Sequence, residues 1–228
     1  MEDATRARIT GHWTMRFGTP VPGLVPVTLA STGRYADAAL VLLLGGQAWV
    51  DAPVVHLDAV SALVRGRTPD ALGDPELWAG MADGPVRGPA DHYWADHTTD
   101  LPPGAGPVEP GRLVELRAAV TAQEWAEAGF DTAGGDAFGI EEDGRLVAAA
   151  VVNPLWGWRA DVGVLVAPGA RGRGLGATVA AAALASGVAQ SGFAVFRAAL
   201  ANDASQGLAR RLGLERHGVN LLVPLAAA

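Results

Sequence analysis

Short apolar runs separated by polar turns predict a series of β-strands in the second half of the chain. The runs 136–141 and 146–152 flank the segment 142–145, Glu-Asp-Gly-Arg, a pattern that predicts two strands joined by a tight turn. Further apolar runs over 160–166 and 193–200 predict two more strands.

Two helices are expected among these strands. The segment from Ala177 to about Ala189 is rich in alanine, the residue with the highest helix propensity. A second helix is expected after Asn202, through Arg211, with Leu212-Gly213-Leu214 at its end. Strands and helices in this order predict a mixed α/β fold.

The first half shows a different succession of elements. Apolar runs over 38–44 and 47–50 flank Gly45-Gly46 and predict a hairpin. Apolar residues at helical spacing predict a helix over 55–64, and Asp74-Pro75-Glu76 favours the start of a short one. The Pro/Gly-rich run 101–111 has the composition of a linker, so we expect an α/β domain over 1–110 and a second domain over 111–228.

Composition limits the classes of protein that are possible. Half of the 228 residues are apolar, which is enough for a core, and no apolar run reaches the ~18 residues of a membrane span. The first residues lack the pattern of a secretory signal, so we expect a cytoplasmic protein that does not bind membranes. The absence of cysteine excludes disulfides, a thiol nucleophile and a cysteine zinc site.

The charge of the chain bears on its partners. All 17 basic residues are arginine, and the formal net charge is −7. Apart from Arg171 and Arg173 there is no basic patch, which argues against nucleic acid as a partner and favours a cationic amine.

A glycine-rich turn carries the strongest chemical signal. The apolar residues 164–166 lead through Pro168 into Arg171-Gly172-Arg173-Gly174-Leu175-Gly176 and then into the alanine-rich helix. Such a turn can bring backbone amides and the positive end of a helix dipole to an anion such as pyrophosphate. The glycine spacing does not fit a dinucleotide-binding fold, and the phosphate loop of nucleotide triphosphatases needs a lysine, which this chain lacks.

The arrangement V-x-P followed by R-x-x-G-x-G resembles the acyl-coenzyme A motif of the GNAT N-acyltransferase superfamily. Asn202, the following helix and Leu212-Gly213-Leu214 resemble its second motif. The resemblance runs from Arg112 to the end and implies a central, mostly antiparallel mixed sheet flanked by helices, with acetyl-CoA as the acyl donor. The first half is compatible with the N-terminal half of the glycine acyltransferase-like branch, a degenerate copy of the catalytic domain.

The resemblance also implies a cofactor site. Backbone amides of the strand before the turn would hold the pantetheine arm and stabilise the oxyanion, and the turn would hold the phosphates. The implied cofactor-binding residues are Val164, Leu165, Val166, Arg171, Gly172, Arg173, Gly174, Leu175, Gly176, Ala177, Asn202 and Ser205.

Direct attack by an amine requires a base, because only the neutral amine is a nucleophile. Asp161 is the first candidate, with Glu141 and Glu124 as alternatives. The tyrosine that serves as general acid in many family members corresponds here to Ala209, which cannot donate a proton. Ser205 or water could replace it, or Ser205 could serve only at the helix start or in cofactor contact.

One further cluster lies in the first half, in the segment Asp91-His92-Tyr93-Trp94-Ala95-Asp96-His97. Its two histidines are five residues apart and do not share a helical face, so we expect no metal site. The aromatic residues could form a wall of the acceptor pocket together with Trp125, Trp156 and Trp158, or could belong to the core.

The sequence therefore predicts an N-acetyltransferase that acts on a small-molecule amine. Two alternatives stay open: a noncatalytic, regulatory acyl-CoA-binding protein, and a protein or peptide N-acetyltransferase. The apolar segment 221–225 predicts a final strand that could join a partner's sheet in a homodimer.

Overall fold

The computed structural model describes residues 1–17, 27–132 and 135–226 and divides the chain into two compact units. Neither unit is a continuous stretch of chain. Unit 1 comprises Met1–Thr5, Tyr93–Arg197 and Asp203–Glu215, and unit 2 comprises Arg6–His92, Ala198–Asn202 and Arg216–Ala228. Helix α1 (Asp3–Phe17) and strands β4 (Arg87–Asp96), β9 (Phe193–Ala199) and β10 (Glu215–Pro224) have residues in both. The units thus follow contacts between distant segments and not the expected division at residue 110.

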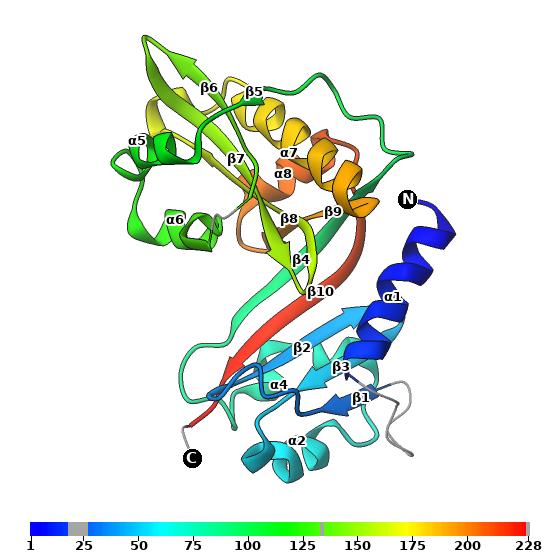
Figure 1. Cartoon of the computed structure of the whole chain (residues 1–228). Coiled ribbons are helices and arrows are strands. Elements are labelled where there is room, and N and C mark those ends of the chain that lie inside the picture. Colours follow the sequence, from blue (N-terminus) through cyan, green and yellow to red (C-terminus); the bar gives the residue numbers. More distant parts are fainter. Residues whose placement is uncertain (18–26, 133–134, 227–228) are drawn as a thin grey trace. The chain divides into compact units, whose positions relative to one another are not determined.

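Unit 1 contains the strands and helices expected over 136–211, and further elements (Figure 1). The expected elements are β6 (Ala137–Glu142), β7 (Arg145–Leu155), β8 (Trp158–Val166), α7 (Leu175–Ser191), β9 and α8 (Asp203–Arg211). The further elements are β5 (Gly106–Pro107), which lies in the run expected to be a linker, α5 (Val114–Arg117), α6 (Ala122–Glu127) and the 3₁₀ turns η2 (Pro110–Leu113), η3 (Phe130–Thr132) and η4 (Pro168–Ala170). The strands β5, β6, β7, β8 and β9 are neighbours in this order. The β5–β6, β6–β7 and β7–β8 pairs are antiparallel and β8–β9 is parallel, as expected for a mostly antiparallel mixed sheet.

Helices cover both faces of this sheet (Figure 1). Leu165 belongs to a core cluster with Leu116 of α5 and Trp125 of α6. Val164 and Val166 point to the other face, because side chains alternate along a strand, and a β-carbon at Gly176 of α7 would lie 3.4 Å from Val166 and 3.9 Å from Val164. The sheet is therefore sandwiched between α5 and α6 on one face and α7 on the other.

Glycines end both long helices of unit 1. Gly192 caps α7 in the left-handed conformation (φ 78°), and its amide donates to Val188 O at 2.7 Å. At the end of α8, the amide of Gly213 (φ 64°) donates to Arg210 O and that of Leu214 to Ala209 O, both at 3.1 Å. This pair of hydrogen bonds is a Schellman motif, and it confirms the helix end expected at Leu212-Gly213-Leu214.

Unit 2 is built on the strands β1, β3, β2 and β10, which are neighbours in this order. Its elements are β1 (Val27–Ala30), β2 (Ala38–Leu44), β3 (Gln47–Asp51), η1 (Val54–His56), α2 (Leu57–Val64), α3 (Pro69–Leu72) and α4 (Pro75–Trp78). The expected hairpin is present as β2 and β3, with Gly45 and Gly46 at positive φ in the turn. Asp74 caps α4 by accepting from the Glu76 amide, in agreement with the predicted helix start.

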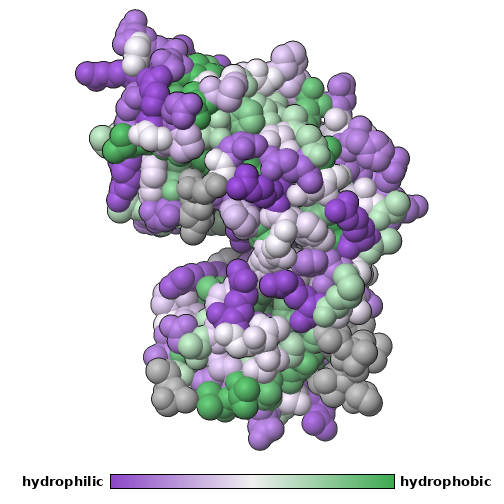
Figure 2. All heavy atoms as spheres, in the orientation of Figure 1, coloured by the Kyte–Doolittle hydropathy of each residue, from purple (hydrophilic) through white to green (hydrophobic). Residues whose placement is uncertain are grey.

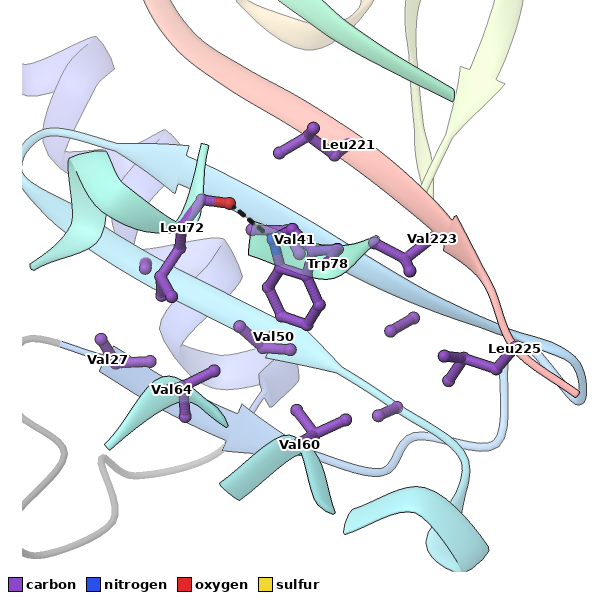
Figure 3. Packing of buried hydrophobic residues seen from close by; sticks show 13 residues of the cluster. Val27, Val41, Val50, Val60, Val64, Leu72, Trp78, Leu221, Val223 and Leu225 are labelled. Atoms are coloured by element: carbon purple, nitrogen blue, oxygen red, sulfur yellow. Dashed lines mark hydrogen bonds between the residues drawn. The ribbon is translucent and has the colours of Figure 1, made fainter. Parts of the chain in front are cut away.

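The core of unit 2 lies between its strands and the short helices (Figure 3). Trp78 is fully buried there and donates its indole N–H to Leu72 O at 2.9 Å. Valines of β2, β3 and α2 and the apolar end of the chain surround it: Val41, Val50, Val60, Val64, Leu221, Val223 and Leu225. The helix predicted over 55–64 is shorter than expected, because the chain begins it as the 3₁₀ turn η1 before α2.

The final strand is not a sheet edge. β10 lies between β2 and β4, and it pairs antiparallel with β2 from Val219 to Pro224. The expectation that it extends a partner's sheet is therefore wrong, because its backbone groups already have partners within this chain. A homodimer stays a prediction, and β10 no longer supports it.

The visible surface in Figure 2 is mainly hydrophilic, with apolar side chains exposed in small groups. In unit 2, Val54 and Val55 are the exposed apolar residues of η1. No helix among the described residues has both the length and the hydrophobicity needed to cross a bilayer.

Candidate active site

The glycine-rich turn links β8 to α7 in unit 1. Gly172 has φ 76° and Gly174 has φ 84°, and Gly174 is the residue that caps the start of α7. A β-carbon at either position would meet no atom within 4 Å. Glycine is required here by the left-handed backbone and not by lack of space, and the side of the turn where side chains would stand is open.

The first amides of α7 are available to a ligand. None of the backbone hydrogen bonds found among the described residues uses the amide of Gly174, Leu175 or Gly176 as its donor. The amides of Ala177 and Thr178, in contrast, donate to Gly174 O at 2.9 and 3.4 Å. Such free amides at the positive end of a 17-residue helix form a site suited to phosphate groups. Of the predicted cofactor amides, the one at Ala177 is already used within the helix.

The strands β8 and β9 separate just before this turn. They pair only at Asp161 with Val195 and at Val162 with Phe196, while β8 stays paired with β7 as far as Val166. From Gly163 onward, the β9 side of β8 therefore has no paired strand. The predicted pantetheine residues Val164, Leu165 and Val166 lie on this open edge, directly before the turn.

Both arginines of the turn bind carboxylates. Arg171 donates from Nε to Val166 O at 3.1 Å and from Nη2 to Glu124 Oε1 at 2.7 Å. Arg173 donates to the two carboxylate oxygens of Glu142 at 2.8 and 2.5 Å. Their contact with a cofactor stays a prediction, and any anion that binds them competes with these carboxylates.

Glu124 is held by its own helix as well as by Arg171. It forms a capping box with Thr121 at the start of α6, in which each residue's side chain accepts from the other's backbone amide. The pKa of Glu124 is lowered to about 2, mainly by the Thr121 amide and then by Arg171. Arg173 likewise lowers the pKa of Glu142.

The three carboxylates that the sequence favours as bases all bind an arginine. Asp161 accepts from Arg197 Nε at 3.0 Å and from Arg197 Nη2 at 2.6 Å. Glu124 binds Arg171, and Glu141 binds Arg112. A proton taken up by Asp161 would displace one of the two Arg197 hydrogen bonds, so its role as a base stays a prediction. Sequence spacing gave no signal for these pairs, because their partners are at least 29 residues apart.

Helix α8 carries the remaining predicted residues of unit 1. Ser205 is half-buried in its first turn, and Ala209, at the family's tyrosine position, is fully buried. One turn before Ala209, the phenol of Tyr93 donates to Gln206 Oε1 at 2.5 Å, and both side chains are buried. This hydroxyl was not expected next to α8. Asn202 directly precedes α8 but belongs to unit 2, so its part in a cofactor site stays a prediction.

A cavity lies elsewhere in unit 1. It measures about 590 Å³ and opens at the β6 edge, where Phe138, Arg112 and Glu141 line it. Phe138 is in register with Ala150, and Ala150 with Val164, so this cavity is two strands, about 10 Å, from the open edge of β8. The cavity and the open edge are thus separate features.

The aromatic residues lie mainly in the core of unit 1. Trp94 is fully buried, and Trp125 is buried against Phe130 with ring centroids 5.0 Å apart. Trp158 packs edge to face on Phe193 at 4.6 Å. Trp94 and Trp125 are therefore core residues, whereas Trp158 is half-buried, and a wall of the acceptor pocket stays a prediction. No group of three or more potential ligands for a metal occurs in the part of the chain that the structure describes.

The comparisons with known proteins agree with this geometry. The model of the Acetyltransferase (GNAT) family matches residues 93–214, more than half of the chain. An acetyltransferase of the GNAT family from Colwellia psychrerythraea is 11% identical, with 99% of this chain and 98% of that chain covered and a TM-score of 0.52.

Two further solved structures are similar. A putative GNAT acetyltransferase from Novosphingobium aromaticivorans is 24% identical, with 62% of this chain and 68% of that chain covered and a TM-score of 0.47. A Drosophila protein is 14% identical, with 85% and 62% covered and a TM-score of 0.51. At these identities the likeness concerns the fold alone, and no curated protein matches the chain. The family match, together with the strand, turn and helix described above, shows that this chain is an enzyme of the GNAT acetyltransferase family.

Proposed function

We propose that this enzyme transfers an acetyl or other short acyl group from acetyl-CoA to the amine of a small molecule. Members of the family use acetyl-CoA as acyl donor, and the family match supports acyl transfer as the general activity of this chain. The observation that carries the proposal is the open edge of β8, which leads directly into a turn with free amides. A chain without cysteine has no thiol to carry the acyl group, so attack by the amine on the thioester is direct.

Different residues of unit 1 bind different parts of acetyl-CoA. The amides of Gly174, Leu175 and Gly176 bind the pyrophosphate, with the α7 dipole adding to their attraction. The open edge of β8 from Val164 to Val166 binds the pantetheine arm and donates a backbone N–H to the thioester oxygen, where negative charge develops. When bound, acetyl-CoA supplies the activated acyl group.

Proton transfer is assigned to two further residues. Asp161 takes the proton of the attacking amine, directly or through a water, and Arg197 holds its carboxylate in place. Ser205 of α8 is the proposed donor to the leaving thiolate, and the hydroxyl of Tyr93 on β4, which donates to Gln206 of the same helix, is a second candidate. Acetyl transfer by Ser205→Ala and Tyr93→Phe, compared at equal saturation with acetyl-CoA, separates the two: the variant that lowers kcat identifies the donor.

The first experiment is calorimetric titration of the full chain with acetyl-CoA, with NADH as the control ligand. We expect micromolar binding of acetyl-CoA and none of NADH. Gly174→Glu places a negative charge on the open side of the turn and should abolish binding. Gly169→Ala, in the same connection with ordinary φ and open space, should leave it unchanged. A folded Gly174→Glu protein with unchanged affinity would reject the cofactor site.

The acceptor is then identified by detecting thiol release with two panels of substrates, small amines and short peptides. The net charge of −7 favours cationic small amines, so these should turn over with the higher kcat/KM. Turnover of peptides alone would replace the small-molecule proposal by peptide N-acetylation.

A further inference from the structure

Arg171 connects the phosphate turn to a helix on the opposite face of the sheet. Its guanidinium binds the last carbonyl of β8, Val166 O, and the carboxylate of Glu124 in the first turn of α6. One side chain thus joins the turn, the end of β8 and the start of α6.

The other end of α6 lies against the open part of β8. A β-carbon at Gly163 would stand 1.9 Å from Ala128 O, so the two backbones approach very closely there. The next carbonyl, Gly129 O, accepts from Asn153 Nδ2 at 3.0 Å. Gly163 is the first residue of β8 beyond its last pairing with β9. The segment 121–129 therefore runs from the phosphate turn to the point where the acyl group would lie.

We propose that the Glu124–Arg171 ion pair is a latch through which phosphate binding at the turn releases the α6 segment, residues 121–129, from β8. This proposal rests on the proposed function, because it needs a phosphate-bearing cofactor at the turn. Glu124 is then a positioning residue that couples the cofactor site to the helix covering the acyl end of β8.

The energies allow this exchange of partners. The side chains of Arg171 and Glu124 are 48% and 34% exposed, and exposed ion pairs contribute only about 0–1 kcal/mol. A phosphate group offers more negative charge than a carboxylate and two oxygens to the flat guanidinium. Because coupling between two sites is reciprocal, the carboxylate that holds Arg171 must weaken phosphate binding by the amount that phosphate weakens the α6 contact.

The second ion pair of the turn supplies a matched control. Arg173 and Glu142 are 51% and 36% exposed, close to the values of the first pair. Glu142 lies at the end of β6, where it pairs with Arg145 of β7, and the side-chain bonds found for it among the described residues go to Arg173 and not to α6. Its removal frees an arginine of the same turn without acting on residues 121–129.

The variant Glu124→Gln removes the charge and keeps the helix cap, because glutamine serves in a capping box as well as glutamate. The test is hydrogen exchange of the full chain with and without coenzyme A, read over residues 121–129, together with the calorimetric Kd of coenzyme A. The wild-type protein, Glu124→Gln and Glu142→Gln are compared.

In the wild type, we expect coenzyme A to speed exchange over 121–129. In Glu124→Gln, exchange is fast without ligand, coenzyme A adds nothing, and the Kd falls by about 2- to 5-fold, the range an exposed ion pair permits. In Glu142→Gln, coenzyme A speeds exchange over 121–129 as it does in the wild type.

Two results overturn the latch alone: coenzyme A binds and leaves exchange over 121–129 unchanged or slower, or Glu142→Gln reproduces the exchange pattern of Glu124→Gln. Absence of coenzyme A binding in all three proteins would reject the cofactor site itself, and the latch with it.

Discussion

Replacing Gly163 by alanine tests the close approach of α6 and β8 most directly. The new β-carbon would lie 1.9 Å from Ala128 O and 3.1 Å from Ala128 C, whereas real contacts of this kind begin at 3.0 Å. Both obstructing atoms are backbone, so no side-chain rotation relieves the clash and the 121–129 segment must move by more than 1 Å. Overpacking of this sort costs about 2–3 kcal/mol. For a protein of this size, that lowers the Tm by roughly 5–10 °C.

The measurement is thermal unfolding of Gly163→Ala beside Gly169→Ala. Gly169 is exposed, has ordinary φ and has no atom within 4 Å of its would-be β-carbon, so its variant should melt within about 1 °C of the wild type. If Gly163→Ala also melts with the wild type, the contact between Ala128 and Gly163 does not exist as described. The Glu124–Arg171 pair would then have no contact between α6 and β8 to release.

Three further predictions concern stability. Ionised Glu124, with its pKa lowered to about 2 from 4.5, stabilises the folded state above pH 4.5, and this contribution is lost as the pH falls toward 2. Over this pH interval, the free energy of unfolding measured with urea should therefore fall more steeply for the wild type than for Glu124→Gln. Parallel pH curves of the two proteins would argue against the hydrogen bonds assigned to Glu124. Trp78→Phe leaves the buried Leu72 O without its donor and should lower the free energy of unfolding by about 1–3 kcal/mol or more, measured by urea titration. Gly207→Ala, inside α8 with open space around it, should raise that free energy by about 0.5–1 kcal/mol, and a lower Tm would contradict this.

Local chemistry explains what the sequence could predict. The start of α7 was predicted to within two residues, at Ala177 in place of Leu175, because the glycine-rich turn and the alanine-rich segment after it differ sharply in helix propensity. The β2–β3 hairpin and the cap at Asp74 were equally local, and both are present. The ten-residue helix expected over 55–64 failed at its first turn, where the apolar spacing does not distinguish a 3₁₀ start from an α-helical one.

Contacts between residues distant in the sequence could not be predicted from the sequence alone. Nothing near Arg171 indicates that its carboxylate partner lies 47 residues earlier, and nothing near Tyr93 points to Gln206, 113 residues later. The candidate bases were chosen as carboxylates near the ends of expected strands or, for Glu124, at the start of a possible helix, and only the structure shows that each already binds an arginine. The sequence positions of these carboxylates do not indicate their partners, because an ion pair between distant residues depends on the fold and not on sequence spacing.

The pairing of β2 with β10 has a consequence for synthesis on the ribosome. The strand Ala-Ala-Leu-Val-Leu-Leu-Leu at 38–44 emerges early, and one of its edges is completed only by residues 219–224. At translation rates of ~5–20 residues per second, this apolar edge waits roughly 10–35 s for its partner. Nascent chains of this enzyme should therefore depend on chaperones that shield unpaired strands, and chains that stop short of residue 219 should aggregate rather than fold.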